Sequence, residues 1–600
     1  MSIDLADPVT TAAGEAFLGV ERSLTGRRWQ ATPADHRLAM AMSQRHGLPE
    51  LVGRVLAGRG VALDQADAFL NPTLRELLPD PFHLKDMDLA VARLVGAIEG
   101  GETIGVFGDY DVDGATSAAL LLRYFSAAGA RVAVHIPDRM REGYGPNAPA
   151  LLKLQSAGVG VVVTVDCGIT AFEPLQAAAA AGLDIIVVDH HEAEAALPRA
   201  LAVVNPNRLD ETSPHGQLAA VGVAFLLVVA VHKALRDRDW YSGRAVPDLM
   251  QWLDIVALGT VCDVVPLVGV NRALVAQGLK VLAKRGNAGI AALADVAGVR
   301  ERMDAFHLGY LLGPRVNAGG RVGQADLGVR LLTTDDAAEA ARLAQTLDGY
   351  NKDRQTIEAA VLQDAMAQVE SRPDDGLPLL LVAGEGWHPG VIGIIAGRLK
   401  ERYNRPACVI AFDGAEGKGS GRSVPSLDLG SAIIAARQAG LLVRGGGHAM
   451  AAGFTVARDR LDAFRAFLGE RLVAQMAGPL RPVLELDSAL DAGGATLELV
   501  ESLRLLGPFG SGNNEPRFAI TAARVVAPRV VGTGHVSCSL AGRSGTRLKA
   551  IAFRAADSEM GQALLAADGT PMHLAGTLRI DNWQGNVKVQ MFIEDAAPAG

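Results

Sequence analysis

The chain has 600 residues, 49% of them hydrophobic, and a formal net charge of −9. This length predicts roughly three or four domains, each large enough to bury its own core. The negative charge argues against a protein that is coated in basic surface, so any face that binds phosphate groups must be local.

The sequence shows no targeting or disulfide signal. It has no stretch of about 18 uncharged apolar residues, the length that a membrane-spanning helix needs. The N-terminus, MSIDLADPVTTAAGEAF, lacks the basic and apolar segments of a secretory signal. The four cysteines are scattered and form no CxxC pair, which argues against a structural zinc site and against disulfides. We therefore expect a cytoplasmic protein that does not bind membranes.

The first half of the chain predicts an α/β domain. Residues 1–75 are mixed in character and are expected to form a peripheral, mostly helical extension. Beyond them, β-branched runs alternate with alanine-rich helical stretches, and the predicted strands are 103–107, 131–136, 159–165 and 184–189. Continuous apolar strands that alternate with helices indicate a parallel sheet covered on both faces. We assign this domain to residues 76–334.

The second half predicts three further parts. Residues 335–371 contain no proline and predict one long amphipathic helix. At 1.5 Å per residue it would span roughly 50 Å, which is enough to connect two domains. A second, smaller α/β domain is expected over residues 372–474. Residues 475–600 contain short β-like runs with glycine turns, which predict a small β-barrel.

The heptapeptide GDYDVDG places Asp109, Asp111 and Asp113 at the end of the first predicted strand. It resembles half of an EF-hand calcium loop, but the twelfth position is Leu120 and a strand precedes it instead of a helix. One aspartate here would be typical of a helix cap. Three within five residues repel one another unless a cation neutralises them. The motif therefore favours a metal site, with a solvated acidic turn as the alternative.

Further acidic residues follow other apolar segments. Asp166 lies in VDCG, the triplet Asp189-His190-His191 ends DIIVVDHH, and Asp263 lies in LGTVCDVVPL. Each alone is more typical of a helix cap, but strand ends of a parallel sheet converge on one crevice. We expect all of these residues at such ends. Carboxylates with one or two imidazoles suit Mn²⁺ or Mg²⁺. Two such ions bridged by a carboxylate can direct in-line attack on phosphorus.

These four motifs resemble the DHH phosphoesterase family, which is named for the triplet at residues 189–191. SGRS (420–423) and GGGHAMAAGF (445–454) resemble the family's associated substrate domain, DHHA1, and LLGPFGSGNNEPRF opens a barrel that resembles an OB-fold. The resemblance implies an α/β fold: a parallel-sheet DHH domain, a long helix, a smaller α/β DHHA1 domain and a C-terminal OB-like β-barrel. Within the family, the likeness is greatest to bacterial single-strand-specific 5′→3′ exodeoxyribonucleases.

The resemblance also implies roles for the site residues. Two divalent ions, Mn²⁺ or Mg²⁺, would be held by Asp111, Asp113, Asp166, His190 and Asp263, with Asp109 as an additional acidic residue. Asp111 and Asp113 would face different ions, and Asp166 would bridge them. His191 would contact the scissile phosphate. Asp189 would orient a histidine rather than bind metal. Apart from Asp189, all of these residues are predicted to be catalytic.

Substrate contacts are expected in four segments. GPRVNAGGRVG (313–323) is expected to be a glycine-rich loop, and RGGGHAM (444–450) a turn whose N–H groups cradle an anion. The predicted phosphate- or DNA-binding residues are Arg139, Tyr144, Arg315, Asn317, Arg321, Ser420, Arg422, Gly446, Gly447 and His448. By resemblance, the DHHA1 domain would hold the 5′-terminal phosphate.

The predicted barrel offers few aromatic side chains for stacking bases. These are Phe509, Phe518, Phe553, Trp583 and Phe592. Because several must lie in its core, DNA contacts are expected to depend more on arginines such as Arg524, Arg543 and Arg547.

Together these features predict a two-metal exonuclease that degrades single-stranded DNA 5′→3′ in DNA repair and recombination. Two alternatives stay open: a DHH phosphoesterase that acts on short oligonucleotides or cyclic dinucleotides, and a non-catalytic DNA-binding scaffold. Polarity, the choice of DNA over RNA, and two partners, a single-strand-binding protein and a DNA helicase, are implied by the resemblance alone. The protein is expected to be a monomer.

Overall fold

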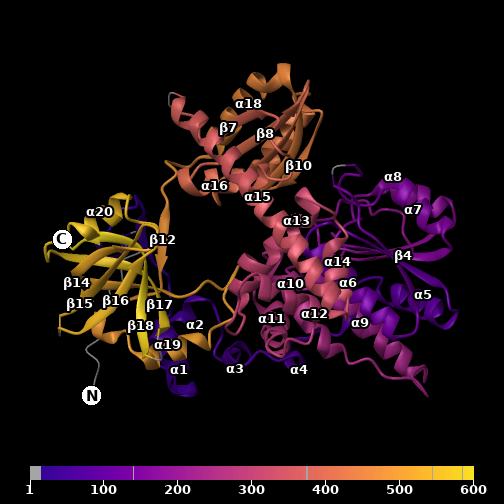
Figure 1. Cartoon of the computed structure of the whole chain (residues 1–600), viewed down its shortest axis with the longest axis horizontal. Coiled ribbons are helices and arrows are strands. Elements are labelled where there is room, and N and C mark those ends of the chain that lie inside the picture. Colours follow the sequence, from indigo (N-terminus) through magenta and orange to yellow (C-terminus); the bar gives the residue numbers. More distant parts are fainter. Residues whose placement is uncertain (1–14, 140, 373–375, 544, 584–585, 600) are drawn as a thin grey trace.

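The computed structural model describes residues 15–139, 141–372, 376–543, 545–583 and 586–599. Figure 1 shows three bodies: a large α/β body that contains β2–β6, a small α/β body that contains β7–β11, and a barrel body that contains β13–β18. Among the described residues, no helix is both long and apolar enough to cross a bilayer.

The large body is built on a five-stranded parallel sheet in the order β3-β2-β4-β5-β6. Its strands are β2 (Thr103–Gly108), β3 (Arg131–His135), β4 (Val159–Val165), β5 (Asp184–Val188) and β6 (Ala202–Val204). The predicted parallel sheet is confirmed, and β6, a strand of three residues, is additional.

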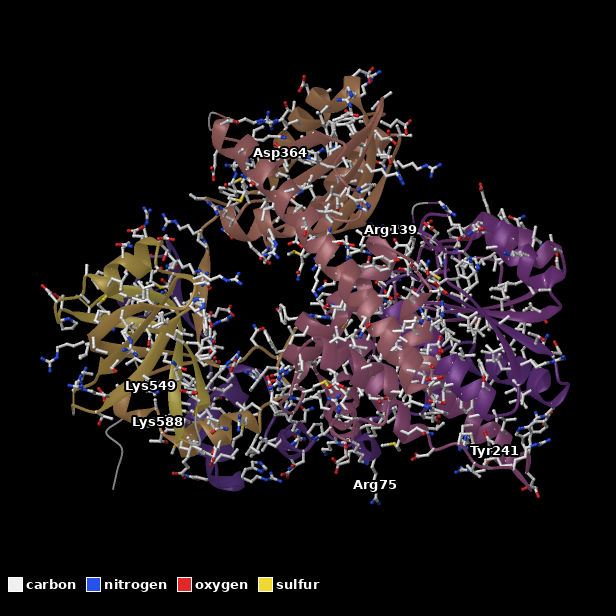
Figure 2. The ribbon with its side chains drawn as sticks, viewed as in Figure 1. Arg75, Arg139, Tyr241, Asp364, Lys549 and Lys588 are labelled. Carbon is white, nitrogen blue, oxygen red and sulfur yellow. The ribbon has the colours of Figure 1, made fainter. Side chains whose placement is uncertain are left out.

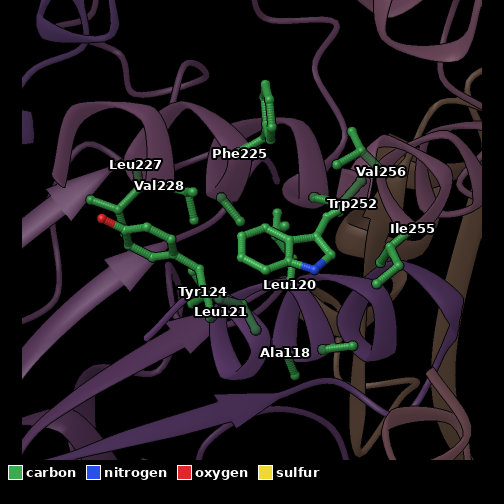
Figure 3. Close-up of a cluster of buried hydrophobic side chains, with 14 of the residues drawn as sticks. Ala118, Leu120, Leu121, Tyr124, Phe225, Leu227, Val228, Trp252, Ile255 and Val256 are labelled. Carbon is green, nitrogen blue, oxygen red and sulfur yellow. The ribbon is translucent and has the colours of Figure 1, made fainter. Parts of the chain in front are cut away.

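Helices cover both faces of this sheet, as continuous apolar strands require. Helices α5 (Met87–Glu99), α6 (Val112–Ala127) and α9 (Ala220–Asp237) share one core, and α7 (Ala148–Ser156) and α8 (Phe172–Ala180) cover the opposite face. Figure 3 shows the first core, where Tyr124 of α6 and Phe225 of α9 pack around Trp252. The large body continues through α11 (Gly269–Leu282), α12 (Ala288–Val296) and α14 (Leu327–Thr333).

Two segments of the large body differ from their predicted conformations. The apolar run before Asp263 is the helix α10 (Leu253–Cys262) and not a strand. Apolar residues surround α10 on all sides, and periodicity cannot separate such a helix from a buried strand. The predicted loop GPRVNAGGRVG is the helix α13 (Gly313–Val322), which follows the π-helical turn η4 (His307–Leu312). Its glycines serve close packing: a Cβ on Gly320 would lie 2.4 Å from the backbone oxygen of Tyr110.

The expected long helix is α15 (Ala337–Ser371), which runs from the large body to the small one (Figure 1). The small body has a mixed sheet in the order β10-β11-β9-β8-β7. Its strands are β7 (Leu380–Glu385), β8 (Ala407–Asp413), β9 (Glu416–Arg422), β10 (Arg444–His448) and β11 (Ala451–Ala457), and its helices are α16 (Ile392–Tyr403), α17 (Leu429–Gln438) and α18 (Leu461–Gln475). The predicted turn RGGGHAM is mostly strand, because β10 pairs with β11 along its whole length.

The barrel body closes because β14 pairs with both β15 and β17. Its elements are β13 (Ser488–Leu490), α19 (Leu497–Arg504), β14 (Arg517–Val531), β15 (His535–Ala541), β16 (Arg547–Ala552), α20 (Glu559–Leu565), β17 (Pro571–Trp583) and β18 (Asn586–Pro598). Closure of the sheet removes exposed strand edges. The expected β-barrel is therefore present.

The N-terminal extension is part of the barrel body and not peripheral, although its first 14 residues lie outside the described ranges. Strand β1 (Arg28–Ala31) pairs in parallel with β12 (Val483–Leu486), and Trp29 is buried with its Nε1 donating to Asp595 at 2.9 Å. Helices α1 (His36–His46) and α2 (Glu50–Gly58) share a core with the barrel. The short helices α3 (Ala66–Leu70) and α4 (Leu74–Leu77) then lead to the large body.

A buried arginine joins the large body to the barrel body. Arg272 of α11 donates to the carbonyl oxygens of Phe69 (2.9 Å) and Gly507 (2.6 Å), and its guanidinium lies 3.9 Å from the centroid of the Phe69 ring. Burial lowers its pKa to about 9. Since Phe69 lies in α3 and Gly507 lies between α19 and β14 of the barrel body, this one side chain connects three segments.

We predict that Arg272→Ala lowers the midpoint of thermal unfolding by about 5 °C, because the buried carbonyls of Phe69 and Gly507 lose their donor. Differential scanning calorimetry would measure this. Lys280→Ala, on the exposed face of the same helix, is the control and should leave the midpoint unchanged. An Arg272→Ala midpoint equal to that of Lys280→Ala would contradict this account of the junction.

Candidate active site

Acidic residues gather at the carboxyl edge of the large body's sheet. Asp109 follows β2, Asp166 follows β4 and Asp189 follows β5, and all three are buried. Asp263 reaches the same place from the C-terminal end of α10. The structure thus brings together the acidic residues that the sequence predicted at strand ends, with Asp263 arriving from a helix.

Two groups of three ligand atoms share this edge. Atoms of Asp109, Asp111 and Asp166 lie within 4.8 Å of one another, and so do atoms of Asp113, His190 and Asp263. Asp166 lies beside both groups, since its Oδ1 is 3.4 Å from Nε2 of His190. A third such group contains Asp166, His190 and His191. The two aspartates of the DVD segment therefore belong to different groups.

Local backbone contacts hold the DVD segment in place. Asp111 caps α6 and accepts a hydrogen bond from the Gly114 N–H at 3.0 Å. A Cβ on Gly114 would lie 2.4 Å from the backbone oxygen of Asp109, so only glycine lets α6 begin this close to β2. Asp113 accepts from the N–H groups of Ala220 (2.6 Å) and Val221 (3.0 Å), at the start of α9.

Asp189 uses its oxygens for contacts inside the protein. It accepts from the N–H groups of Ile169 (3.1 Å) and His190 (2.8 Å) and from Nδ1 of His191 at 2.7 Å. Burial alone would raise the pKa of Asp189, but the His191 ring and these N–H groups hold it below its usual value. The same contact raises the pKa of His191 against the effect of burial. Asp189 therefore orients the His191 ring.

Both ring nitrogens of His190 lie near the acidic cluster, since Nε2 is 3.4 Å from Asp166 Oδ1 and Nδ1 is 3.6 Å from Asp263 Oδ2. Nδ1 also lies 3.1 Å from the carbonyl oxygen of Leu218, so Nε2 is the nitrogen that has no hydrogen-bond partner among the described residues. Burial, together with the neighbouring His191, lowers the pKa of His190 to about 4. The ring is therefore neutral at pH 7, which is the form that binds metal ions.

The donor set fits divalent cations. Three buried atoms at this edge have no hydrogen-bond partner among the described residues: Asp109 Oδ1, His190 Nε2 and Asp263 Oδ2. Buried polar atoms are normally paired, so such a cluster needs a ligand. Burial and neighbouring aspartates raise the pKa of Asp113 to about 7 and that of Asp263 to about 9. Without a cation the site would hold protons instead.

Backbone strain also concentrates here. Asp166 has φ +60°, and Val264, which follows Asp263, has φ +63°. Left-handed backbone at residues other than glycine costs of order 1–3 kcal/mol, and more is expected for a β-branched residue. Such strain is concentrated at functional sites, so these two residues indicate that this edge of the sheet is a functional site.

Several predicted phosphate-binding residues gather beside the site, between the large and small bodies (Arg139 is labelled in Figure 2). Arg139 lies 5.2 Å from the ring centroid of Tyr110, and Arg321 donates to the carbonyl oxygen of Gly390 at 2.9 Å. Burial, followed by the charge of Arg139, lowers the pKa of Arg321 to about 10 and also lowers that of Arg422. These guanidinium groups are therefore close enough to repel one another, and an anion would relieve that repulsion.

Ser420 and Arg422 lie at the end of β9 next to the first turn of α16. Arg422 donates to Ser420 Oγ at 3.2 Å, and a Cβ on Gly393 would lie 3.1 Å from that oxygen and 3.2 Å from Arg422 Nη2. His448, in β10, has its Nδ1 3.2 Å from Glu192 of the large body. Gly446 and Gly447 precede it in the same strand.

The remaining predicted contacts differ in their surroundings. Arg315 donates to Asp348 of α15 at 2.9 Å and to the carbonyl oxygen of Leu311, so its guanidinium is engaged inside the protein. Asn317 is half-buried in α13. Tyr144 donates to the backbone oxygen of Asp166 at 3.3 Å. Tyr110, whose ring lies next to Arg139, was not among the predicted contacts, although its aromatic ring among the acidic residues of GDYDVDG was an available signal.

The barrel's aromatic residues divide between core and surface. Phe518 is fully buried, Phe553 is half exposed, and Arg579 lies over the Phe592 ring at 4.9 Å. Arg59 lies over Phe509 at 5.8 Å. The side chain of Trp583 lies outside the described residues. Arg524, Arg543 and Arg547 are exposed, as are Lys549 and Lys588 (Figure 2).

Three family models match along the chain. The N-terminal domain of the DHH family matches residues 103–260, the DHHA1 domain matches 376–474, and the RecJ OB domain matches 486–595. Together with the acidic sheet edge, these matches define a DHH phosphoesterase.

Comparison with individual relatives shows which branch of the DHH phosphoesterases the chain belongs to. The chain is 39% identical over 569 residues to the single-stranded-DNA-specific exonuclease RecJ of Dickeya dadantii, and the match covers 92% of this chain and 96% of that protein. RecJ from Thermus thermophilus, solved in complex with Mn²⁺, has a TM-score of 0.79 at 31% identity, and the match covers 94% of this chain and 78% of that one. The corresponding complex with Mg²⁺ has a TM-score of 0.74 at 29% identity, over 95% and 77% of the two chains. The chain belongs to the RecJ family.

The raised pKa values predict a pH-dependent stability of the metal-free protein. The pKa values of about 7 for Asp113 and about 9 for Asp263 lie above the value near 4 of unfolded aspartate. Their protons therefore stabilise the fold fully below about pH 4, and that stability is lost progressively as the pH rises from about 4 to about 9. The unfolding midpoint in EDTA should fall over this range, and saturating Mn²⁺ should remove the fall and raise the midpoint by about 5 °C or more.

Asp263→Asn tests the cause of this behaviour. It should raise the midpoint in EDTA at pH 8 and lose most of the Mn²⁺-induced rise, because one buried charge and one ligand are removed together. Asp254→Asn, at the other end of α10, is the matched control: Asp254 is buried, but it belongs to neither ligand group. An undiminished Mn²⁺ effect in Asp263→Asn would show that the cation lies elsewhere.

Proposed function

We propose that this protein is a two-metal exonuclease that degrades single-stranded DNA by phosphodiester hydrolysis. The main support for this proposal is the pair of ligand groups at one edge of the sheet, with Asp166 beside both. Three buried ligand atoms at this edge have no hydrogen-bond partner among the described residues. Membership of the RecJ family supports single-stranded DNA as the substrate, and the barrel body supplies an OB-like platform.

Asp109, Asp111 and Asp166 would hold one ion, and Asp113, His190 and Asp263 the other, with Asp166 between them. The relatives solved with Mn²⁺ and Mg²⁺ support these two metals. When bound, the two ions supply a water of near-neutral pKa and offset charge on the phosphate.

The chain's own residues orient the reaction. His190 is kept neutral with Nε2 facing inward, so it serves as a ligand and not as an acid. His191, whose pKa is raised by its contact with Asp189, is suited to donate a hydrogen bond to a phosphate oxygen. Asp189 fixes that ring. No side-chain nucleophile is required.

The arginines between the two α/β bodies support cleavage from a 5′ end. Arg139, Arg321 and Arg422 come from separate elements and would grip a terminal phosphate together with Ser420. A phosphate held there would leave the next linkage for hydrolysis at the metal edge. We infer 5′→3′ polarity from this arrangement and from the family resemblance.

We further infer that the protein works in the cytoplasm as a monomer, in DNA repair and recombination. A single-strand-binding protein and a DNA helicase are its expected partners. These inferences rest on the family resemblance. The domain boundaries at residues 75, 334, 371 and 474 are part of the same proposal.

The end-binding proposal predicts the effect of Arg422→Ala. The variant should lose about tenfold or more in kcat/KM on a 5′-phosphorylated strand, because a charge-assisted contact to the phosphate disappears. On a 5′-hydroxyl strand its loss should be much smaller. Arg437→Ala, on the exposed side of α17 in the same body, should match the unaltered protein on both substrates. Equal losses of Arg422→Ala on the two substrates would contradict 5′-phosphate binding.

The metal proposal predicts that Asp166→Ala abolishes Mn²⁺-dependent hydrolysis while retention of DNA largely survives. The assay compares single-stranded and double-stranded DNA, each labelled at the 5′ or the 3′ end, with a dinucleotide. Release of mononucleotides from the 5′ end of single strands is expected. Asp364→Ala, on α15 in the small body, is the control (Figure 2). Full activity of Asp166→Ala would refute the metal assignment, and a preference for the dinucleotide would favour a small-substrate phosphoesterase.

A further inference from the structure

An exposed aromatic pair lies outside the machinery described so far. The side chains of Phe306 and Tyr310 are 50% and 72% exposed. Their rings are stacked, with centroids 5.0 Å apart and planes inclined by 27°. Exposed large apolar groups that cluster together mark binding surfaces more often than isolated ones do. The exposed pair therefore indicates a binding surface.

The pair is carried by a segment that packs directly against the metal-binding helix. Cys262, the last residue of α10, donates from Sγ to the carbonyl oxygen of Leu308 at 3.4 Å, and a Cβ on Gly309 would lie 3.4 Å from the Val261 side chain. Asp263 follows Cys262, and the next residue, Val264, is 69% exposed. Exposed apolar side chains thus lie on both segments that meet beside Asp263.

The segment that carries the pair is anchored by contacts of a buried histidine. Tyr310 lies within the π-helical turn His307–Leu312, an element that is rare and frequent at functional sites. Between the two aromatic residues, the buried ring of His307 contacts Asp304 at 2.6 Å and Glu301 at 3.0 Å. This anchoring means that little conformational entropy is lost when a ligand stacks on the rings.

We propose that Phe306 and Tyr310 form a stacking platform for an unpaired base of the bound strand. The proposal rests on the exonuclease function proposed above. Every base has a π face, so the platform is independent of sequence, whereas a base inside a duplex has no face to offer. Arg300 and Arg302 are exposed shortly before the pair and can contact the DNA backbone, while the neighbouring Glu301 and Asp304 are engaged with His307.

A nucleic-acid base fits this surface better than a protein does. The exposed apolar group comprises two rings and one valine, whereas a stable protein interface buries about 800 Å² on each partner. A single base covers a ring of this size. The contact of Leu308 with Cys262, which directly precedes the ligand Asp263, also connects the platform to the metal edge.

The test is a binding cycle between protein and DNA variants. The protein variants are the double substitution Phe306→Leu with Tyr310→Leu, which keeps apolar bulk without an aromatic face, and Tyr310→Phe, which keeps the face. The DNA is a strand of about 20 nucleotides, longer than one OB-fold site, with one abasic nucleotide moved along it. Affinity is measured by fluorescence anisotropy in EDTA, where no hydrolysis occurs.

In a series of strands with the abasic nucleotide at successive positions, one strand should lack the base that stacks on the rings. The unaltered protein and Tyr310→Phe should bind that strand about tenfold more weakly than the intact strand. The double variant should bind the intact strand about tenfold more weakly and should be insensitive at that position. Persistence of the abasic penalty in the double variant would overturn the proposal, as would unchanged affinity of that variant for the intact strand. A change in its sedimentation with unchanged DNA affinity would assign the pair to contacts between copies instead.

Hydrolysis distinguishes this proposal from the one on which it rests. The double variant should cleave a dinucleotide with Mn²⁺ at the rate of the unaltered protein, because a dinucleotide does not reach the platform. A reduced dinucleotide rate would show that the rings act on the metal site and would overturn the proposal. If the unaltered protein hydrolysed no strand with Mn²⁺, the exonuclease function would fail, and the anisotropy result would still decide whether the rings bind bases.

Discussion

The rest of the structure depends on the repulsion among carboxylates that are buried at one edge of one sheet. Asp109, Asp113, Asp166 and Asp263 could not all be charged there without a cation, and their raised pKa values express that cost. The fold opposes the repulsion with fixed geometry: glycine brings α6 against β2, and strained backbone is kept at Asp166. A parallel sheet with both faces covered provides the rigid frame that such a site needs.

In the proposed function, each of the three bodies would contact a different part of the substrate. The large body supplies the metal edge, the small body brings Ser420 and Arg422 toward the arginines of the large body, and the barrel body provides exposed basic side chains on a closed sheet. Helix α15 joins the first two bodies. Arg272 connects the third to the first through backbone carbonyls.

Much of this could be predicted from the sequence, because strong local signals and global fold agree. The four strands of the large sheet, the long helix and the barrel follow from apolar periodicity and glycine turns. Asp263 was placed on a strand because a helix that is apolar on all sides has no periodicity to reveal it. Two glycine-rich segments were predicted wrongly as a loop and a turn. In α13 and at Gly445 and Gly447 of β10, glycine permits close packing inside a regular element. The internal ion pair of Arg315 with Asp348 and the stacked Phe306–Tyr310 pair depend on tertiary placement, which no local pattern encodes.

The central claim is that Asp166 lies between two divalent ions. Anomalous diffraction at the manganese edge from crystals soaked in Mn²⁺ tests it most directly. The account predicts two peaks about 3.5–4 Å apart, one beside Asp109 and Asp111 and the other beside Asp113 and Asp263, with Asp166 contacting both. A single peak, or two peaks away from Asp166, would contradict it.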